Sequence, residues 1–123
     1  MKKILIIDDK KDAGGFYGKL TIGSKFSLKI AQNATEALEI LDNSYDLIIY
    51  DSDTLGSKGL AVLEQIKDRT GGTIPLIMIV DSYGEVKNKD LKNLGISDFL
   101  FKPLSIEALS LSVSRIFVMS WYE

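Results

Sequence analysis

Acidic side chains follow three short apolar runs of the chain, and a lysine follows a fourth. The residues concerned are Asp8 and Asp9, then Asp51 and Asp53, then Asp81, and finally Lys102. In a parallel α/β sheet, the carboxyl ends of the strands meet at one edge, which is where such proteins bind ligands. A single aspartate after a strand would mean little, because polar residues often stand there. The coincidence of four such segments predicts one charged pocket.

Carboxylates crowded beside one ammonium favour phosphoryl chemistry. The carboxylates repel one another unless a cation neutralises them. Mg²⁺ prefers oxygen ligands and commonly joins protein carboxylates to a phosphoryl oxygen. With the metal and the Lys102 ammonium in place, a carboxylate can attack phosphorus to form an aspartyl phosphate. The pattern therefore predicts a pocket that binds Mg²⁺ and accepts a phosphoryl group.

Five apolar stretches predict the strands that carry these residues. Four of them are continuous, at residues 4–7, 47–50, 76–80 and 99–101. Continuous runs are typical of strands covered on both faces in a parallel sheet. The fifth stretch, residues 26–30, alternates apolar and polar side chains, so we expect it at an edge of the sheet.

Apolar residues at helical spacing predict helices between the strands. The predicted helices span residues 34–41, with Asn33 or Thr35 as N-cap, residues 59–67, ended by Gly71 and Gly72, and residues 105–117, capped by Ser105. These cap residues satisfy backbone groups at helix ends or adopt the backbone conformation that ends a helix. Strands and helices that alternate in this way indicate a three-layer α/β sandwich, in one domain spanning residues 1–123.

Two further helices are weakly specified. Residues 13–22 contain Gly14, Gly15 and Gly18, each of which costs about 1 kcal/mol in a helix interior. We expect that helix to be irregular or to pack unusually close to its neighbour. Residues 85–94 are mostly polar, so we expect the helix there to be the most mobile.

Composition excludes several classes of protein. The 123 residues include no cysteine, so disulfides and thiolate metal sites are impossible, and no apolar run is long enough to span a membrane. The net charge of −2 comes without a basic stripe, which argues against nucleic-acid binding. We expect a cytoplasmic protein. Histidine is absent, so the phosphoryl donor must be another molecule.

Four motifs in this order resemble the receiver domain of response regulators in two-component signalling, over nearly the whole chain. They are Ile4-Leu5-Ile6-Ile7-Asp8-Asp9, Asp46-Leu47-Ile48-Ile49-Tyr50-Asp51 with Gly59-Leu60 downstream, Ile74-Pro75-Leu76-Ile77-Met78, and Asp98-Phe99-Leu100-Phe101-Lys102-Pro103. The resemblance implies a flavodoxin-like fold, with a five-stranded parallel sheet in the order 2-1-3-4-5 and about five helices. It also implies a signalling receiver rather than an enzyme, catalysing at most its own phosphorylation and dephosphorylation.

The same resemblance assigns roles within the pocket. Asp51 would be the phosphoacceptor, and Lys102 would contact the phosphoryl group. Asp9, Asp51 and the backbone carbonyl of Asp53 would bind Mg²⁺, while Asp8 would hold a metal-bound water. The Lys102-Pro103 peptide bond is expected to be cis. A histidine kinase or phosphotransfer protein would donate the phosphoryl group, and the fourth helix, fifth strand and fifth helix would contact an output partner.

The chain departs from the family pattern at the positions that sense phosphorylation. Val80 stands where a Thr or Ser is usual, so the hydroxyl that bonds the phosphoryl oxygen is missing, unless a one-residue slip lets Ser82 supply it. Asp81 adds a negative charge, which would disfavour the phosphorylated state or supply another metal ligand. Phe99 occupies the position of the rotating aromatic switch residue. Two interpretations stay open: a working phosphoreceiver, and a degenerate receiver that acts as a protein-binding surface.

A remote alternative is a phosphatase of the haloacid-dehalogenase type. The sequence Asp51-Ser52-Asp53-Thr54 is close to the Asp-x-Asp motif of those enzymes, which form an aspartyl phosphate with Mg²⁺ and use the second Asp as general acid and base. Against this alternative, their motif ordinarily follows the first strand, and no acidic pair follows Lys102 in this chain.

Overall fold

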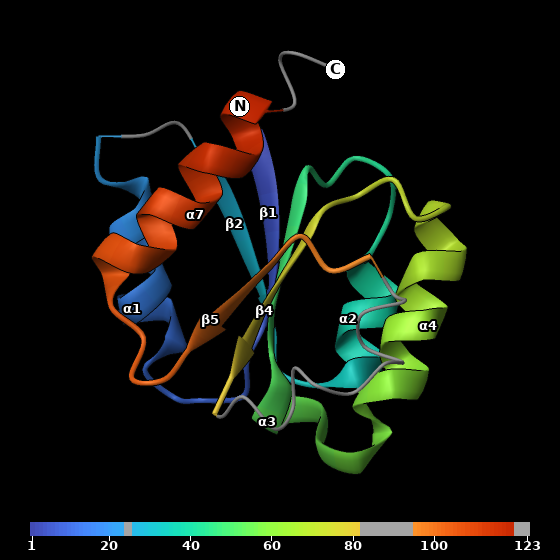
Figure 1. Ribbon diagram of the computed structural model, residues 1–123. Helices are drawn as coiled ribbons and strands as arrows, with labels where there is room; N and C mark the ends of the chain where they lie inside the picture. The colour runs from blue at the N-terminus through green and yellow to red at the C-terminus, as the bar shows by residue number, and fades with distance from the viewer. Residues whose placement is uncertain (24–25, 82–94, 120–123) are drawn as a thin grey trace.

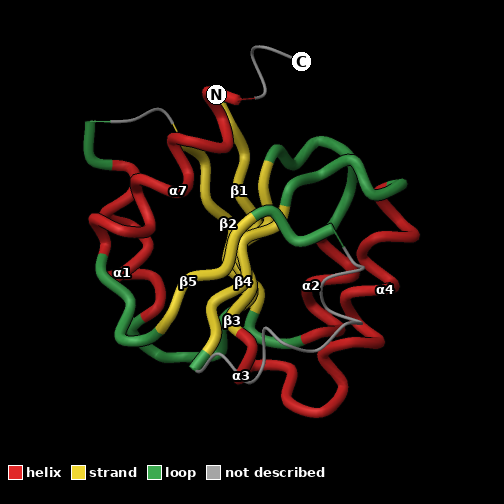
Figure 2. Tube along the Cα trace, in the orientation of Figure 1, coloured by secondary structure: helices red, strands yellow, loops and turns green. Residues whose placement is uncertain are grey.

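A computed structural model describes residues 1–23, 26–81 and 95–119, and it contains five parallel strands between two layers of helices (Figure 1, Figure 2). The strands are β1 (Lys2–Ile7), β2 (Phe26–Ala31), β3 (Leu47–Asp51), β4 (Leu76–Val80) and β5 (Asp98–Phe101). Their order in the sheet is β2-β1-β3-β4-β5. The predicted flavodoxin-like fold, with strand order 2-1-3-4-5, is confirmed.

Helices cover both faces of the sheet. The described residues form five α-helices: α1 (Ala13–Gly18), α2 (Ala34–Ile40), α3 (Ser52–Leu55), α4 (Gly59–Thr70) and α7 (Ile106–Met119). Helices α1 and α7 lie on one face, and α2 and α4 lie on the other (Figure 1). Across the described ranges, no helix is long and apolar enough to cross a membrane. The helix expected at residues 85–94 lies outside the described residues.

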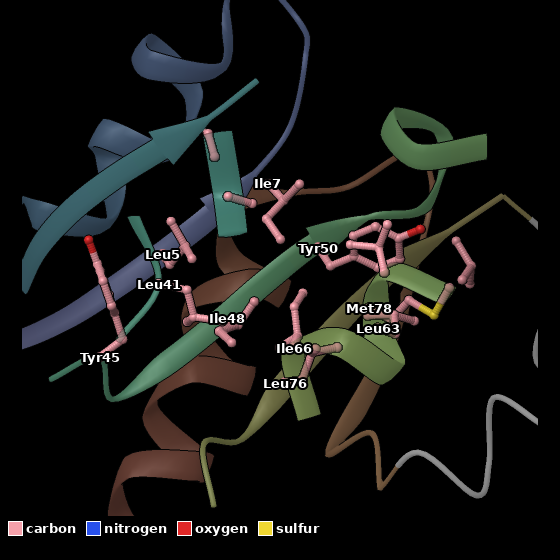
Figure 3. Packing of buried hydrophobic residues seen from close by; sticks show 14 residues of the cluster. Leu5, Ile7, Leu41, Tyr45, Ile48, Tyr50, Leu63, Ile66, Leu76 and Met78 are labelled. Atoms are coloured by element: carbon pink, nitrogen blue, oxygen red, sulfur yellow. The ribbon is translucent and has the colours of Figure 1, made fainter. Parts of the chain in front are cut away.

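The continuous apolar runs of the strands are explained by two separate cores. Alternate side chains of β1 point to opposite faces, so that Ile4 and Ile6 join the core beneath α1 and α7, while Leu5 and Ile7 join the core beneath α2 and α4. Figure 3 shows the second core, in which strand residues pack with Ile66 of α4. Because both faces of these strands are covered by apolar side chains, polar side chains can be accommodated only at the strand ends.

Strand β2 lies at one edge of the sheet, as its alternating sequence predicted. Ser27 and Lys29 are exposed, whereas Phe26, Leu28 and Ile30 are half-buried and pack against the core beneath α1 and α7. At this edge one side of the strand faces solvent, which accommodates its alternating polar residues.

The helix ends follow the predicted caps. The Asn33 side chain accepts a hydrogen bond from the Glu36 backbone N–H at 2.8 Å, so Asn33, and not Thr35, is the N-cap of α2. The Ser105 hydroxyl accepts from the Ala108 backbone N–H at 3.1 Å. Gly71 ends α4 with a φ of +67°, a conformation that strains any residue with a Cβ.

Helix α1 is short and irregular, as its glycines predicted. It gives way after Gly18 to a 3₁₀ turn, η1 (Lys19–Thr21). The alternative expectation of unusually close packing is wrong, because a Cβ added at Gly14, Gly15 or Gly18 would meet no atom within 4 Å. The glycines therefore weaken this helix without allowing a closer contact in return.

This leads to a stability prediction. Gly14→Ala combined with Gly15→Ala should raise the free energy of unfolding by about 0.5–1 kcal/mol for each substitution, because alanine loses less backbone entropy in a helix and has room here. Urea unfolding followed by circular dichroism measures the change. Gly71→Ala is the control and should lower stability because of its positive φ. An unchanged or less stable double variant would contradict the prediction.

Candidate functional site

The carboxyl edge of the sheet gathers the predicted residues from four strand ends. Asp8 follows β1, Asp51 ends β3, Asp81 follows β4 and Lys102 follows β5. In Figure 1 this edge is the lower one, where β3 continues into α3. The Lys102 backbone N–H donates to the Val80 carbonyl at 3.0 Å, which extends the pairing of β4 and β5 up to the site.

Asp51 lies at the centre of the site and is buried, with 2% of its surface exposed. Its Oδ1 accepts hydrogen bonds from the Asp53 backbone N–H at 3.0 Å and from the Lys102 ammonium at 3.1 Å. Its Oδ2 accepts from the Lys10 ammonium at 2.6 Å. Each oxygen of this buried carboxylate is thus paired with a positive charge, which offsets the cost of removing it from water.

Lys102 joins three acidic side chains. Besides Asp51, its Nζ lies 2.5 Å from Oδ2 of Asp53 and 3.6 Å from Oδ1 of Asp81. Partial burial opposes the charge of Lys102, but the hydrogen bonds and charges of Asp53 and Asp51 outweigh this and raise its pKa above the ordinary value. The hydrogen bond from Lys102 correspondingly lowers the pKa of Asp53. The predicted cis peptide bond between Lys102 and Pro103 is present.

Asp8 is buried beside Asp51 and is held by two donors. Its Oδ1 accepts from the Lys10 backbone N–H at 2.9 Å, and its Oδ2 accepts from the Tyr17 hydroxyl at 2.8 Å. Burial of the Tyr17 hydroxyl, followed by the negative charge of Asp8, raises the pKa of Tyr17 well above the ordinary tyrosine value. Tyr17 therefore keeps its proton, and its neutral hydroxyl orients the Asp8 carboxylate by donating a hydrogen bond to it.

Asp9 lies at the exposed rim of the site. Its backbone N–H donates to the Thr54 hydroxyl at 3.1 Å, and that hydroxyl donates to Oδ1 of Asp9 at 3.4 Å. In the part of the chain that the structure describes, no three acidic side chains converge in an arrangement that could hold a metal ion. The donors are nevertheless of the right kind, because carboxylate and carbonyl oxygens are the hard ligands that Mg²⁺ prefers.

Sequence analysis missed Lys10 and Tyr17. The Lys10 ammonium lies between the two buried carboxylates, 2.6 Å from Oδ2 of Asp51 and 3.7 Å from Oδ1 of Asp8. A basic residue directly after an acidic pair was the available signal for Lys10. Tyr17 gave no separate signal, because an aromatic residue in a predicted helix is ordinarily a core residue.

A cavity of about 200 Å³ opens beside Asp51. Its charged lining includes both ammonium groups, and apolar side chains from α1, β4 and the segment after β5 complete its wall. The lining residues are Asp8, Lys10, Asp12, Ala13, Phe16, Tyr17, Asp51, Ile79, Lys102, Pro103 and Leu104. Two ammonium groups next to a buried carboxylate can attract an anionic group and bring it to the Asp51 oxygens.

The residues at the predicted switch positions Val80, Asp81 and Phe99 lie in or next to β4 and β5. Val80 is the last residue of β4, pairs with Phe101 and is fully buried in the core beneath α2 and α4. Asp81 lies directly beyond the strand, and Ser82, which the slip would bring to the site, lies outside the described residues. Phe99 is half-buried in β5 and packs against the same core.

Comparison with known proteins gives one consistent family. The family model of the response regulator receiver domain matches residues 4–114. The response regulator ArlR of Staphylococcus saprophyticus is 33% identical over 113 residues, covering 89% of this chain and 49% of ArlR. The transcriptional regulatory protein CpxR of Escherichia coli is 29% identical, covering 100% of this chain and 53% of CpxR. The chain thus spans about half the length of these relatives.

Solved structures agree in fold. A two-component response regulator from Clostridium difficile is 30% identical, with a TM-score of 0.78, and the match covers 95% of this chain and 96% of the other. The non-phosphorylated receiver domain of HemR from Leptospira biflexa is 20% identical, with a TM-score of 0.82 and 94% of each chain covered. The second likeness, at its lower identity, is one of fold alone.

The Tyr17–Asp8 hydrogen bond can be tested through stability. Tyr17→Phe should lower the free energy of unfolding by about 1–3 kcal/mol near neutral pH, because it leaves an oxygen of the buried Asp8 carboxylate without its donor. Urea unfolding of the metal-free protein measures this loss. Tyr45→Phe removes a hydroxyl from another buried tyrosine that does not face Asp8, and it should cost less.

The same variant carries a prediction about pH. Above about pH 10 the unfolded chain loses the Tyr17 proton while the folded protein keeps it, so stability should fall as pH rises. The raised pKa of Lys102 acts in the same alkaline range and direction, because the unfolded chain loses this proton there while the folded protein keeps it. Tyr17→Phe should therefore flatten the alkaline decline by up to about 1.4 kcal/mol per pH unit without abolishing it. Equal slopes in the variant and wild type would contradict this.

Proposed function

The chain belongs to the response regulator receiver domain family, and on that premise we propose that it accepts a phosphoryl group on Asp51 from a partner histidine kinase or phosphotransfer protein. The observation that carries the proposal is a buried carboxylate with an ammonium on each of its oxygens, next to a cavity. A carboxylate placed in this way is shielded from water and supplied with positive charge for an incoming anion.

The transfer would proceed by attack of an Asp51 oxygen on phosphorus. A P–O bond forms, the P–N bond of the partner's phosphohistidine breaks, and the electron pair passes to the imidazole nitrogen, which takes up a proton. The attacking oxygen must first lose its ammonium partner. Lys10 has 46% of its side chain exposed, compared with 22% for Lys102, so we expect Lys10 to withdraw while Lys102 stays to hold the phosphoryl oxygens.

Mg²⁺ is part of this proposal. Asp9, Asp51 and the Asp53 carbonyl would bind it, with Asp8 holding a bound water. When bound, the ion would supply positive charge that offsets the carboxylates and the charge developing on the phosphoryl group. The oxygen donors support this assignment, and the exposed Asp9 side chain can turn from Thr54 towards the site.

A degenerate receiver is the second candidate, favoured by one observation. Val80 is fully buried and has no hydroxyl with which to bond a phosphoryl oxygen. In that function the domain would bind its partner without phosphorylation, through a surface that includes β5 and α7. A phosphatase of the haloacid-dehalogenase type does not fit, because the Asp51 motif lies at the end of the third strand of the chain rather than the first and the family match is to receivers.

Phosphorylation can be tested directly. Incubation with acetyl phosphate and Mg²⁺ should add one phosphate to the intact protein, as measured by mass spectrometry, and Asp51→Asn should abolish the addition. Asp68→Asn is a matched control, because Asp68 is an exposed aspartate of α4, and it should be labelled as wild type is. Absence of label from wild type with acetyl phosphate and with a range of phosphohistidine donors would favour the degenerate receiver.

The altered switch residues give a separate prediction. Val80→Thr combined with Asp81→Ala should lengthen the lifetime of the phosphorylated protein or raise its yield. Threonine supplies the missing hydroxyl, and alanine removes a negative charge next to Lys102. The decay of the label after removal of acetyl phosphate measures the lifetime. Unchanged decay and yield in the double variant would mean that these positions do not govern the phosphorylated state.

A further inference from the structure

The buried part of the site is charge-balanced by the chain's own residues. Asp8 and Asp51 are the two carboxylates of the site that are buried, and Lys10 and Lys102 supply two ammonium groups in contact with them. Buried carboxylates need such partners, because an unpaired charge away from water is strongly unfavourable. Lys10 and Lys102 together thus supply, without a metal, two positive charges, as many as a divalent cation would supply.

The position of Lys10 is fixed by its own backbone. Its N–H donates to Oδ1 of Asp8 at 2.9 Å, and its carbonyl accepts from the Ala13 N–H at 3.1 Å, where α1 begins. The side chain therefore starts from a defined point beside Asp8 and reaches across to Asp51. A tether of this kind keeps the ammonium at high local concentration near the two carboxylates.

Lys102 and Lys10 differ in how firmly they are held. Lys102 contacts three acidic side chains, whereas the Lys10 ammonium contacts Asp51 and Asp8 and is about twice as exposed. Withdrawal of Lys10 into solvent therefore breaks fewer ion pairs. Of these two ammonium groups, Lys10 is the one that can be exchanged.

From this geometry we propose that Lys10 is a tethered cation that competes with Mg²⁺ for the space between Asp8 and Asp51 and so sets the metal affinity of the site. The inference rests on the proposed function, because it concerns the metal that the phosphoacceptor site would use. It predicts a weakly binding site in wild type, in which the metal must displace an ammonium before it can contact Asp51.

The test compares Mg²⁺ binding among charge variants by isothermal titration calorimetry. Lys10→Met and Lys10→Gln should each bind Mg²⁺ about tenfold or more tightly than wild type, because both remove the competing charge beside two buried carboxylates. Lys10→Arg keeps the charge and should bind as weakly as wild type. Lys11→Met is the matched control for net charge, because Lys11 is exposed and adjacent, and it should change affinity by less than about threefold.

A second readout does not depend on binding heats. Without metal, Lys10→Met should melt at a lower temperature than Lys11→Met, because it leaves Asp51 with one ammonium fewer. Saturating Mg²⁺ should raise the melting temperature of Lys10→Met more than that of wild type, since tighter binding to the folded state gives more stabilisation.

The outcomes separate this inference from the proposed function. If wild type binds Mg²⁺ and is labelled on Asp51, but Lys10→Met and Lys11→Met show the same affinity change, the competition is wrong and the phosphoacceptor assignment stands. If neither wild type nor any Lys10 variant binds Mg²⁺, the competition is overturned together with the metal-dependent part of the proposed function.

Discussion

Two carboxylates, those of Asp8 and Asp51, are buried where the apolar central strands of the sheet end, and the rest of the site depends on how their charges are balanced. Removing them from water costs several kcal/mol per ion unless each finds close partners. Lys102 and Lys10 supply the positive charges, while the Tyr17 hydroxyl and backbone N–H groups fill the remaining acceptor positions. The same arrangement shields the Asp51 carboxylate from water and keeps cations close to it.

The fold explains why charges are buried here and not elsewhere. Strands β1, β3 and β4 are covered on both faces, so their interiors tolerate only apolar side chains. Polar groups can approach the centre of the molecule only where these strands stop. Asp51 and Lys102 therefore lie in contact although they are 51 residues apart in the chain. The parallel sheet supplies this proximity whichever residues occupy the strand ends.

Sequence reasoning succeeded where periodicity or strand position decides the outcome. It predicted that strands and helices alternate and that Asp51 and Lys102 lie at one edge of the sheet, because both follow from which residues end an element. The strand order was implied by the family resemblance, and Asn33 was one of two candidate caps for α2. Sequence reasoning missed α3, since four residues carry no helical period. It missed the contacts of Lys10 and Tyr17 because they depend on side-chain direction within the turn after β1 and in an irregular helix, which no spacing rule fixes.

Val80 and Lys10 bear on the same energetic question. A ligand or modification shifts a conformational equilibrium only through interactions that differ between the two states. With valine at position 80, this side chain has no hydroxyl that could form a hydrogen bond to a phosphoryl oxygen. The Lys10–Asp51 pair, by contrast, is present in the unmodified protein, and in the proposed transfer it would have to break before that Asp51 oxygen could react. On the proposed mechanism, the conformational preferences of the unphosphorylated and phosphorylated protein would therefore differ through the loss of the Lys10–Asp51 ion pair. A new hydrogen bond from residue 80 at the end of β4 would not contribute.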